Sequence, residues 1–337
     1  MKIIVTGASG FVGTNLTLAL AKNHDELLLI DDLSRPLVDK NRDYIELVTE
    51  NRIQTIDITD TAAIIKIFDD FGCPDMVVNL AGQVSLLESI QNPIRDFMIN
   101  AYAPLTMLEY FRVREMNPIF LNISSNKVYG NLKNYPVIEK EKRYAISGDI
   151  ISLDESTPLD FYGPYGCSKG SADQYLMDYW RIFGMKTISF RQSTIYGPFQ
   201  RPTSDQGWVV YMIEQILKGE TIQLNGIGKQ VRDILYVSDL VDLIIRVSKM
   251  DDFPFGQTFN VGGGPKNSLS ILELFSLLKS HTGKDPKYIE GSERPGDQKY
   301  YVSNIEKICR VANWSPATDF QNGILKVLSH KSQGDNA

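Results

Sequence analysis

The start of the chain combines a strand, a glycine-rich turn and a helix in a way that few folds accommodate. Residues 2–6 (Lys-Ile-Ile-Val-Thr) form an apolar, β-branched run that predicts a buried strand. Gly7, Gly10 and Gly13 follow at once, and residues 14–21 are predicted to be helical. Glycines in such a turn let backbone N–H groups approach a phosphate at the positive end of the helix. The segment therefore predicts the first unit of a dinucleotide-binding α/β domain.

A second apolar strand is predicted over residues 26–30, and the carboxylates Asp31 and Asp32 follow it directly. Asp31 lies beyond Gly13 at close to the spacing of about 20 residues at which an acid binds an adenosine ribose. A negative charge there would repel a 2′-phosphate, so we expect NAD rather than NADP. The alternative is a glycine-rich turn of no function, which the ordered succession of strand, glycines, helix, strand and acid disfavours.

Tyr165 and Lys169 are spaced to lie on one face of a helix. A free tyrosine titrates near pH 10, so its pKa must fall by roughly 2.5 units before it is half ionised near pH 7.5. A neighbouring lysine and an oxidised nicotinamide ring could lower it, because nearby cations favour the phenolate. The pair alone also fits a tyrosine and a lysine on a solvated helix. The glycine turn favours the interpretation as a proton-transfer pair.

The glycine spacing and the Tyr165–Lys169 pair together resemble the extended short-chain dehydrogenase/reductase superfamily, which includes the NAD-dependent epimerases and dehydratases of nucleotide sugars. Further matches follow the third, fourth and fifth predicted strands, and the resemblance spans about residues 1–320. It implies NAD as the cofactor. The positions that it assigns to NAD are Gly7, Gly10, Phe11, Val12, Gly13, Asp31, Asp32, Asp57, Ile58, Leu80, Ala81, Gly82, Asn100, Tyr165 and Lys169.

The same resemblance implies a catalytic set of Ser125, Tyr165 and Lys169. Counting back four residues from Tyr129 of the Val-Tyr-Gly motif gives Ser125, whose hydroxyl is expected to hydrogen-bond the reacting sugar alcohol. The alternative for Ser125 is a hydroxyl that satisfies backbone groups at a strand end.

Arginines in polar loops of the C-terminal half match the family positions that hold a nucleotide diphosphate. A guanidinium can bind phosphate oxygens in a bidentate manner. The alternative for each arginine is a surface ion pair. The positions expected to bind substrate are Gln83, Ser125, Asn126, Lys127, Thr194, Gln206, Trp208, Arg232 and Arg294.

The residues after Ser125 bear on the type of reaction. Dehydratases of the superfamily carry an Asp-Glu pair there, whereas this chain has Asn126 and Lys127. Neither is a carboxylic acid, so loss of water is disfavoured. Epimerisation needs only that Tyr165 takes the hydroxyl proton while a hydride leaves and later returns to the other face of the sugar. A dehydratase or reductase of the same superfamily, and a non-catalytic NAD-sensing protein, are the alternatives.

A narrower resemblance is to the branch of the family that inverts C2 of CDP-dideoxysugars, the conversion of CDP-paratose to CDP-tyvelose for lipopolysaccharide or a similar glycan. It includes the segment 154–164, which precedes Tyr165, and the segments 205–209 and 267–270. The resemblance leads us to expect a threonine at position 125, but this chain has Ser125. The serine keeps the hydroxyl group, and its χ1 rotamer is less restricted than that of a threonine. Nothing in the arginines distinguishes cytidine from uridine, and an epimerase of another nucleotide sugar, with UDP or GDP, is the alternative.

The βα alternation to about residue 190 predicts an α/β fold, a Rossmann-type doubly wound parallel sheet, with a smaller C-terminal α/β substrate lobe. We expect the NAD-binding domain over residues 1–192 with a returning segment at about 234–264. The nucleotide-sugar-binding lobe is expected over residues 193–233 and 265–330. One helix is expected over residues 93–116, and the insertion at 137–151 shows no recognisable pattern.

Composition limits the partners. A net charge of −6 argues against nucleic-acid binding. No apolar run approaches 18 residues and the chain opens with a strand, so neither a membrane span nor a signal peptide is expected. Three widely spaced cysteines indicate reduced thiols of the cytoplasm, and no metal site is expected. An apolar stripe after Tyr165 suits helix pairing, so we expect a homodimer through the helices near 100–115 and 165–183.

Overall fold

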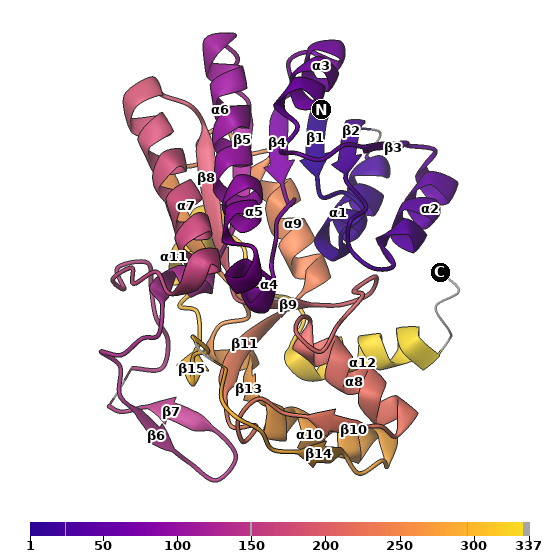
Figure 1. Ribbon diagram of the computed structural model, residues 1–337, viewed down its shortest axis with the longest axis vertical. Helices are drawn as coiled ribbons and strands as arrows, with labels where there is room; N and C mark the ends of the chain where they lie inside the picture. Colours follow the sequence, from indigo (N-terminus) through magenta and orange to yellow (C-terminus); the bar gives the residue numbers. More distant parts are fainter. Residues whose placement is uncertain (24, 149, 295, 333–337) are drawn as a thin grey trace.

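A computed structural model describes residues 1–23, 25–148, 150–294 and 296–332, and Figure 1 shows a larger sheet-centred part above a smaller lobe. The larger part is built on a seven-stranded sheet with the order β12-β8-β5-β4-β1-β2-β3, in which every pairing is parallel. This confirms the predicted fold class. Its strands are β1 (Lys2–Thr6), β2 (Glu26–Asp31), β3 (Ile53–Thr55), β4 (Met76–Asn79), β5 (Ile119–Ser125), β8 (Thr187–Gln192) and β12 (Gln257–Val261).

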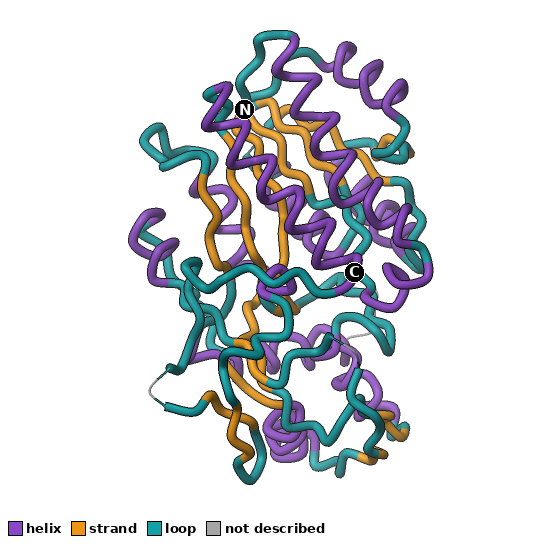
Figure 2. Tube along the Cα trace, turned by 60° about the vertical axis from the view of Figure 1, so that its left-hand side comes forward, coloured by secondary structure: helices purple, strands orange, loops and turns teal. Residues whose placement is uncertain are grey.

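Helices cover both faces of this sheet, as the turned view in Figure 2 shows. Successive residues of a strand point to opposite faces. In β1, Ile3 and Val5 therefore join one apolar cluster and Ile4 joins the other. The first cluster packs beneath α1 (Phe11–Ala21), α2 (Val38–Thr49), α9 (Val237–Val247) and α11 (Glu306–Ala312). The second packs beneath α3 (Thr61–Phe71), α6 (Ala103–Val113) and α7 (Gly163–Phe183).

The helix predicted over residues 93–116 is interrupted. The structure has α5 (Pro93–Phe97), a π-helical turn η1 (Met98–Tyr102) and then α6, after a short α4 (Leu86–Gln91). In the π turn the N–H of Ala103 donates to the carbonyl of Met98, five residues back. Pro104 has no N–H and cannot complete an α-helical hydrogen bond to residue 100. The widened turn carries the buried Asn100.

The smaller lobe has its own sheet and core. β11 (Val231–Tyr236) pairs with β9 (Thr194–Tyr196), β13 (Ser268–Ser270) and β15 (Tyr300–Tyr301), while β10 (Thr221–Gln223) pairs with β14 (Lys287–Ile289). The helices are α8 (Trp208–Lys218), α10 (Ile271–Thr282), α12 (Phe320–Ser332) and the 3₁₀ turn η3 (Pro265–Asn267). The start of α10 is fixed by a capping box in which Ser270 and Glu273 satisfy each other's backbone N–H groups.

The insertion at 137–151 contains a β-hairpin. Residue 149, which follows the hairpin, lies outside the described residues. β6 (Val137–Glu139) and β7 (Tyr144–Ile146) pair antiparallel. Tyr144 and Ile146 are buried, and Ile146 joins an apolar cluster with Tyr300 and Tyr301 of the smaller lobe. The pattern was too short and too polar on its outer side to be recognised as a hairpin.

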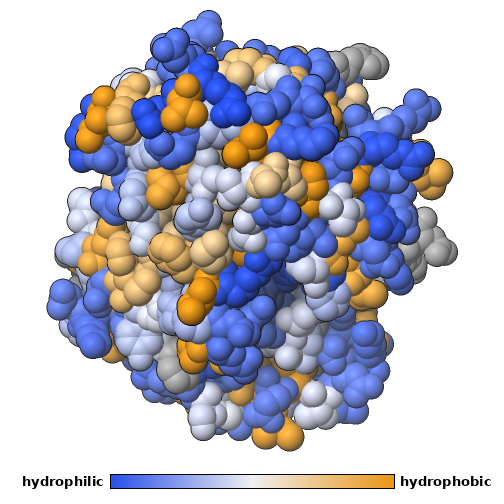
Figure 3. All heavy atoms as spheres, turned by 45° about the horizontal axis from the view of Figure 1, so that its top comes forward, coloured by the Kyte–Doolittle hydropathy of each residue, from blue (hydrophilic) through white to orange (hydrophobic). Residues whose placement is uncertain are grey.

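The outer surface is mixed in character. On the face shown in Figure 3, hydrophilic residues predominate and hydrophobic ones form small groups. Among the helices of the described residues, none combines the length and the apolar character that crossing a lipid bilayer requires.

Candidate active site

One cleft of about 860 Å³ lies at the carboxyl ends of the main-sheet strands and is closed by the smaller lobe. Ligands of open parallel sheets bind at this edge. With two exceptions, Asn100 and Lys169, every residue that the sequence assigned to cofactor or substrate lines the cleft. These are Gly7, Gly10, Phe11, Val12, Gly13, Asp31, Asp32, Asp57, Ile58, Leu80, Ala81, Gly82, Gln83, Ser125, Asn126, Lys127, Tyr165, Thr194, Gln206, Trp208, Arg232 and Arg294.

The glycine turn forms a cradle that side chains would fill. Gly7 has φ +70, and a Cβ there would lie 2.7 Å from the N of Ala81. A Cβ on Gly13 would collide with the carbonyl oxygen of Gly7. α1 begins directly after Gly10 without any side-chain cap on its N–H groups. The turn thus brings uncapped backbone donors to the cleft, which fits the pyrophosphate of a dinucleotide.

The two carboxylates after β2 differ in environment. Asp31 is buried and accepts hydrogen bonds from the N–H of Ser9 (2.9 Å) and of Leu33 (2.9 Å). Burial raises its pKa. Asp32 is more exposed and accepts from the Ser34 hydroxyl at 2.7 Å. Asp31 therefore links β2 to the glycine turn while it also borders the cleft.

Arg35 was not predicted as a site residue. It lines the cleft, and its Nη2 donates to Oε1 of Gln206 at 2.5 Å. Burial lowers its pKa, whereas the neighbouring Asp31 raises it. The only signal for Arg35 in the sequence was its place as a basic residue shortly after Asp31 and Asp32 in the chain.

Tyr165 and Ser125 meet at the floor of the cleft. Ser125 ends β5 and caps the 3₁₀ turn η2 (Asn126–Tyr129), where its Oγ accepts from the N–H of Lys127 at 3.2 Å. Tyr165 lies in the first turn of α7. Burial raises the pKa of Tyr165 to about 12, although a hydrogen bond with Ser125 acts in the opposite direction. In the chain alone, burial therefore outweighs the hydrogen bond with Ser125 and the charge of Arg35, and the lowered pKa expected from the sequence stays a prediction for the complex with NAD.

Lys169 lies one turn further along α7, behind the wall of the cleft. Its Nζ donates to the carbonyl of Ile123 at 3.0 Å, and burial lowers its pKa to about 8. A Cβ on Gly82, which lines the cleft, would lie 3.0 Å from Nζ of Lys169 and 3.2 Å from Oδ1 of Asn100. These two polar atoms therefore lie directly behind Gly82, where a larger side chain would press against them.

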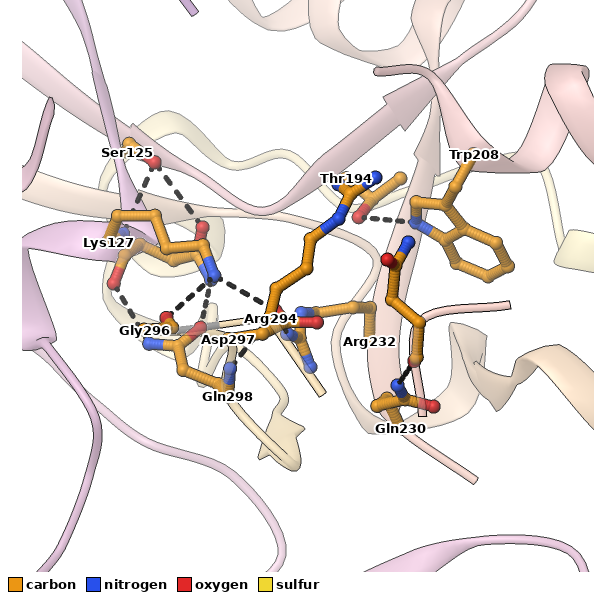
Figure 4. Close-up of polar contacts among 12 residues, drawn as sticks. Ser125, Lys127, Thr194, Trp208, Gln230, Arg232, Arg294, Gly296, Asp297 and Gln298 are labelled. Carbon is orange, nitrogen blue, oxygen red and sulfur yellow. Dashed lines mark hydrogen bonds and ion pairs between the residues drawn. The ribbon is translucent and has the colours of Figure 1, made fainter. Parts of the chain in front are cut away.

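Each predicted substrate arginine is paired with an aspartate that the sequence did not single out. Nη2 of Arg232 lies 2.7 Å from Oδ1 of Asp297, and Nη1 of Arg294 lies 2.7 Å from Oδ1 of Asp205. Lys127 also reaches Asp297, as Figure 4 shows. These pairs lie in the wall of the cleft and are not surface ion pairs.

Thr194, Trp208, Asn126 and Gln83 are held by neutral hydrogen bonds. Nε1 of Trp208 donates to Oγ1 of Thr194 at 3.3 Å (Figure 4). Nδ2 of Asn126 donates to Oε1 of Gln298 at 2.8 Å. Nε2 of Gln83 donates to the carbonyl of Ser85, while its buried Oε1 has no hydrogen-bond partner among the described residues. The cleft can therefore hold an anion beside a hydroxyl and a phenol, next to a dinucleotide cradle.

The comparisons with known proteins agree with this geometry. Residues 3–262 match the NAD-dependent epimerase/dehydratase family. The chain is 38% identical over 341 residues to a CDP-paratose 2-epimerase of Salmonella typhi, covering 98% of this chain and 99% of the relative. A UDP-glucose 4-epimerase of Thermotoga maritima, solved with UDP-glucose, has a TM-score of 0.84, 27% identity and 99% coverage of both chains. The same four values hold for a UDP-glucuronic acid 4-epimerase of Bacillus cereus, solved with UDP-glucuronic acid and NAD.

Proposed function

Because this chain belongs to the NAD-dependent epimerase/dehydratase family, we propose that it inverts C2 of a CDP-dideoxysugar and converts CDP-paratose to CDP-tyvelose. The observation that carries a redox epimerisation is that Ser125 and Tyr165 border the same cleft as the glycine cradle. The choice of C2 and of a CDP-sugar is supported by the similarity to a CDP-paratose 2-epimerase over nearly the whole chain. The product would serve lipopolysaccharide or a similar glycan.

The cofactor is held by residues at the carboxyl ends of β1 to β4. Gly7, Gly10 and Gly13 receive the pyrophosphate, and Asp31 and Asp32 border the adenosine ribose. When bound, NAD supplies a hydride acceptor and a positively charged ring. The rest of the cofactor is bordered by residues that line the cleft further along, namely Asp57, Ile58, Leu80, Ala81 and Gly82.

The chain's own residues move the proton. Tyr165 takes the proton of the sugar hydroxyl and later returns it, and the Ser125 hydroxyl positions that alcohol. A pKa near 12 is too high for a base at neutral pH, so Tyr165 needs an added positive charge in the complex. Lys169 contributes part of it from behind the wall of the cleft, where its Nζ would lie 3.0 Å from a Cβ on Gly82.

The nucleotide sugar is held by its diphosphate. Arg232, Arg294 and Thr194 contact the diphosphate, while Gln206 and Trp208 border the rest of the nucleotide. Gln83, Asn126 and Lys127 face the sugar. Loss of water is disfavoured because neither Asn126 nor Lys127 can act as a carboxylic acid.

A second candidate is an epimerase of a UDP-sugar, favoured by the UDP-sugars in similar solved structures. NMR of the protein with NAD and a panel of CDP-, UDP- and GDP-sugars in deuterated water separates the two. We expect inversion of the CDP-sugar at C2 without solvent deuterium at that carbon. Deuterium incorporation there would indicate carbanion chemistry, and inversion of a UDP- or GDP-sugar alone would reject the CDP assignment. A keto sugar that accumulates would indicate a dehydratase or reductase.

We also propose a homodimer, because α7 exposes several large apolar residues. Tyr175, Trp180, Ile182 and Phe183 are each more than one third exposed, and Tyr102 and Val113 are exposed at the ends of the neighbouring helical segment. Sedimentation of the purified protein would test the dimer, and Trp180→Glu should produce monomers. The three cysteines are free thiols, which supports the cytoplasm as the place of action.

A further inference from the structure

Two cations share a single carboxylate oxygen on the wall of the cleft (Figure 4). Oδ1 of Asp297 lies 2.7 Å from Nη2 of Arg232 and 3.1 Å from Nζ of Lys127. It also accepts from the N–H of Gln298 at 3.0 Å. The Arg232 and Lys127 side chains are only 12% and 14% exposed. Among the described residues, no hydrogen bond reaches Oδ2 of Asp297.

This arrangement holds more positive than negative charge. One carboxylate cannot neutralise two cations, and a charge with little access to water requires a partner. Burial raises the pKa of Asp297, but the charge of Lys127 and then that of Arg232 outweigh it and bring the pKa to about 2. Lys127 is therefore a second counter-ion for Asp297, at 3.1 Å from Oδ1 where Arg232 lies at 2.7 Å.

Arg232 and Lys127 differ in their other contacts and in their place along the cleft. Arg232 lies on β11, and its Nη1 donates to the carbonyl of the adjacent Val231 at 2.7 Å. When Arg232 turns to a phosphate, Asp297 loses one partner. Breaking a buried ion pair is costly chiefly because one charge is left alone. Lys127 comes from η2, beneath the sugar end of the cleft, and its ammonium group also reaches the carbonyl of Gly296 at 3.5 Å.

We propose that Lys127 is a positioning residue that retains Asp297 when Arg232 exchanges this carboxylate for a phosphate of the substrate. The inference rests on the proposed function, because it takes Arg232 as a ligand of the diphosphate. In this exchange Lys127 acts through Asp297 and needs no contact with the diphosphate. Because Lys127 remains paired with Asp297, Arg232 can leave this carboxylate without leaving its charge unpaired.

Calorimetric titration of the NAD-bound protein with CDP tests the exchange. Lys127→Met leaves Asp297 to Arg232 alone, so we expect affinity for CDP to fall about tenfold or more. Adding Asp297→Asn releases Arg232 again, so the double variant should bind CDP more tightly than Lys127→Met. Lys127→Arg should restore most of the affinity. Lys299→Met removes a cation from the same loop, where Lys299 pairs with Glu293, and should leave CDP binding unchanged.

Unchanged CDP affinity in Lys127→Met, or a double variant that binds no better than Lys127→Met, would overturn the proposal. The second result is what a direct contact between Lys127 and the substrate would give. Melting temperature and NAD affinity of each variant report folding, and a purely structural role would lower both without rescue by Asp297→Asn. If the wild type binds UDP or GDP in place of CDP, the nucleobase of the proposed function is wrong. The same cycle titrated with that nucleotide then still decides the exchange.

Discussion

At the scale of single residues, the hydroxyl of Tyr165 is the atom on which the proposed chemistry depends. Tyr165→Phe removes the proton acceptor and keeps the ring, so turnover should fall about 10²- to 10⁴-fold. Affinity for NAD and for the nucleotide sugar should stay within a few-fold of the wild type. Steady-state rates with calorimetric affinities measure both. Tyr175→Phe, on the exposed side of the same helix, is the matched control.

A near-normal rate in Tyr165→Phe would assign the proton transfer to another group. A loss of cofactor binding without any defect in the folded protein would indicate that the phenol holds NAD and does not act as the base. Retained binding with no turnover also separates an enzyme from a non-catalytic NAD-sensing protein, provided that the wild type turns over.

The charge of Asp31 is predicted to exclude NADP. Asp31→Asn removes the charge and keeps one acceptor oxygen, so one of the two hydrogen bonds from Ser9 and Leu33 is also lost. Discrimination against NADP should fall by about tenfold or more, because placing like charges together in an interface costs on the order of a few kcal/mol. Binding constants for NAD and NADP in wild type and variant measure this ratio. A wild type that already prefers NADP would contradict the role given to Asp31.

At the scale of elements, the first strand, turn and helix act as one unit. Gly13→Ala places a Cβ against the carbonyl oxygen of Gly7 and must shift the turn. Overpacking of this kind costs about 1–3 kcal/mol, so we expect a lower unfolding midpoint in urea and weaker NAD binding. Fluorescence titration and urea denaturation report the two effects. Ala21→Gly at the end of α1 is the control for helix stability, and NAD affinity should not change in it.

The sequence predicts this unit well because its signals are local. Strand, glycines, helix and acid are neighbours in the chain, and buried parallel strands have continuous apolar runs. The sequence did not predict the π turn, because a proline such as Pro104 is also common in the first turn of an ordinary α-helix. The pairs Arg232–Asp297 and Arg294–Asp205 were missed because nothing local marks them. The same holds for the pair Lys127–Asp297, whose members are 170 residues apart in the chain.

At the scale of the whole molecule, Asp297 ties the main sheet to the smaller lobe. Lys127 follows β5 of the sheet, whereas Arg232 belongs to β11 of the lobe, and both are held by the same carboxylate. The two parts are therefore joined by charge at the cleft as well as by apolar packing. A pKa of about 2, below the ordinary 3.8, makes this link dependent on pH.

Because the pKa of Asp297 is lower in the folded chain, its contribution to stability is fully present above about pH 4 and is lost as the pH falls through about 2. The shift corresponds to about 2 kcal/mol. Asp297→Asn should therefore lower the free energy of unfolding by about this amount at pH 7, and the difference from the wild type should shrink toward zero near pH 2. Urea denaturation at a series of pH values measures it. A difference that stays constant from pH 7 to pH 2 would show that Asp297 stabilises the protein through its shape and hydrogen bonds, and that the ionic link between sheet and lobe contributes nothing.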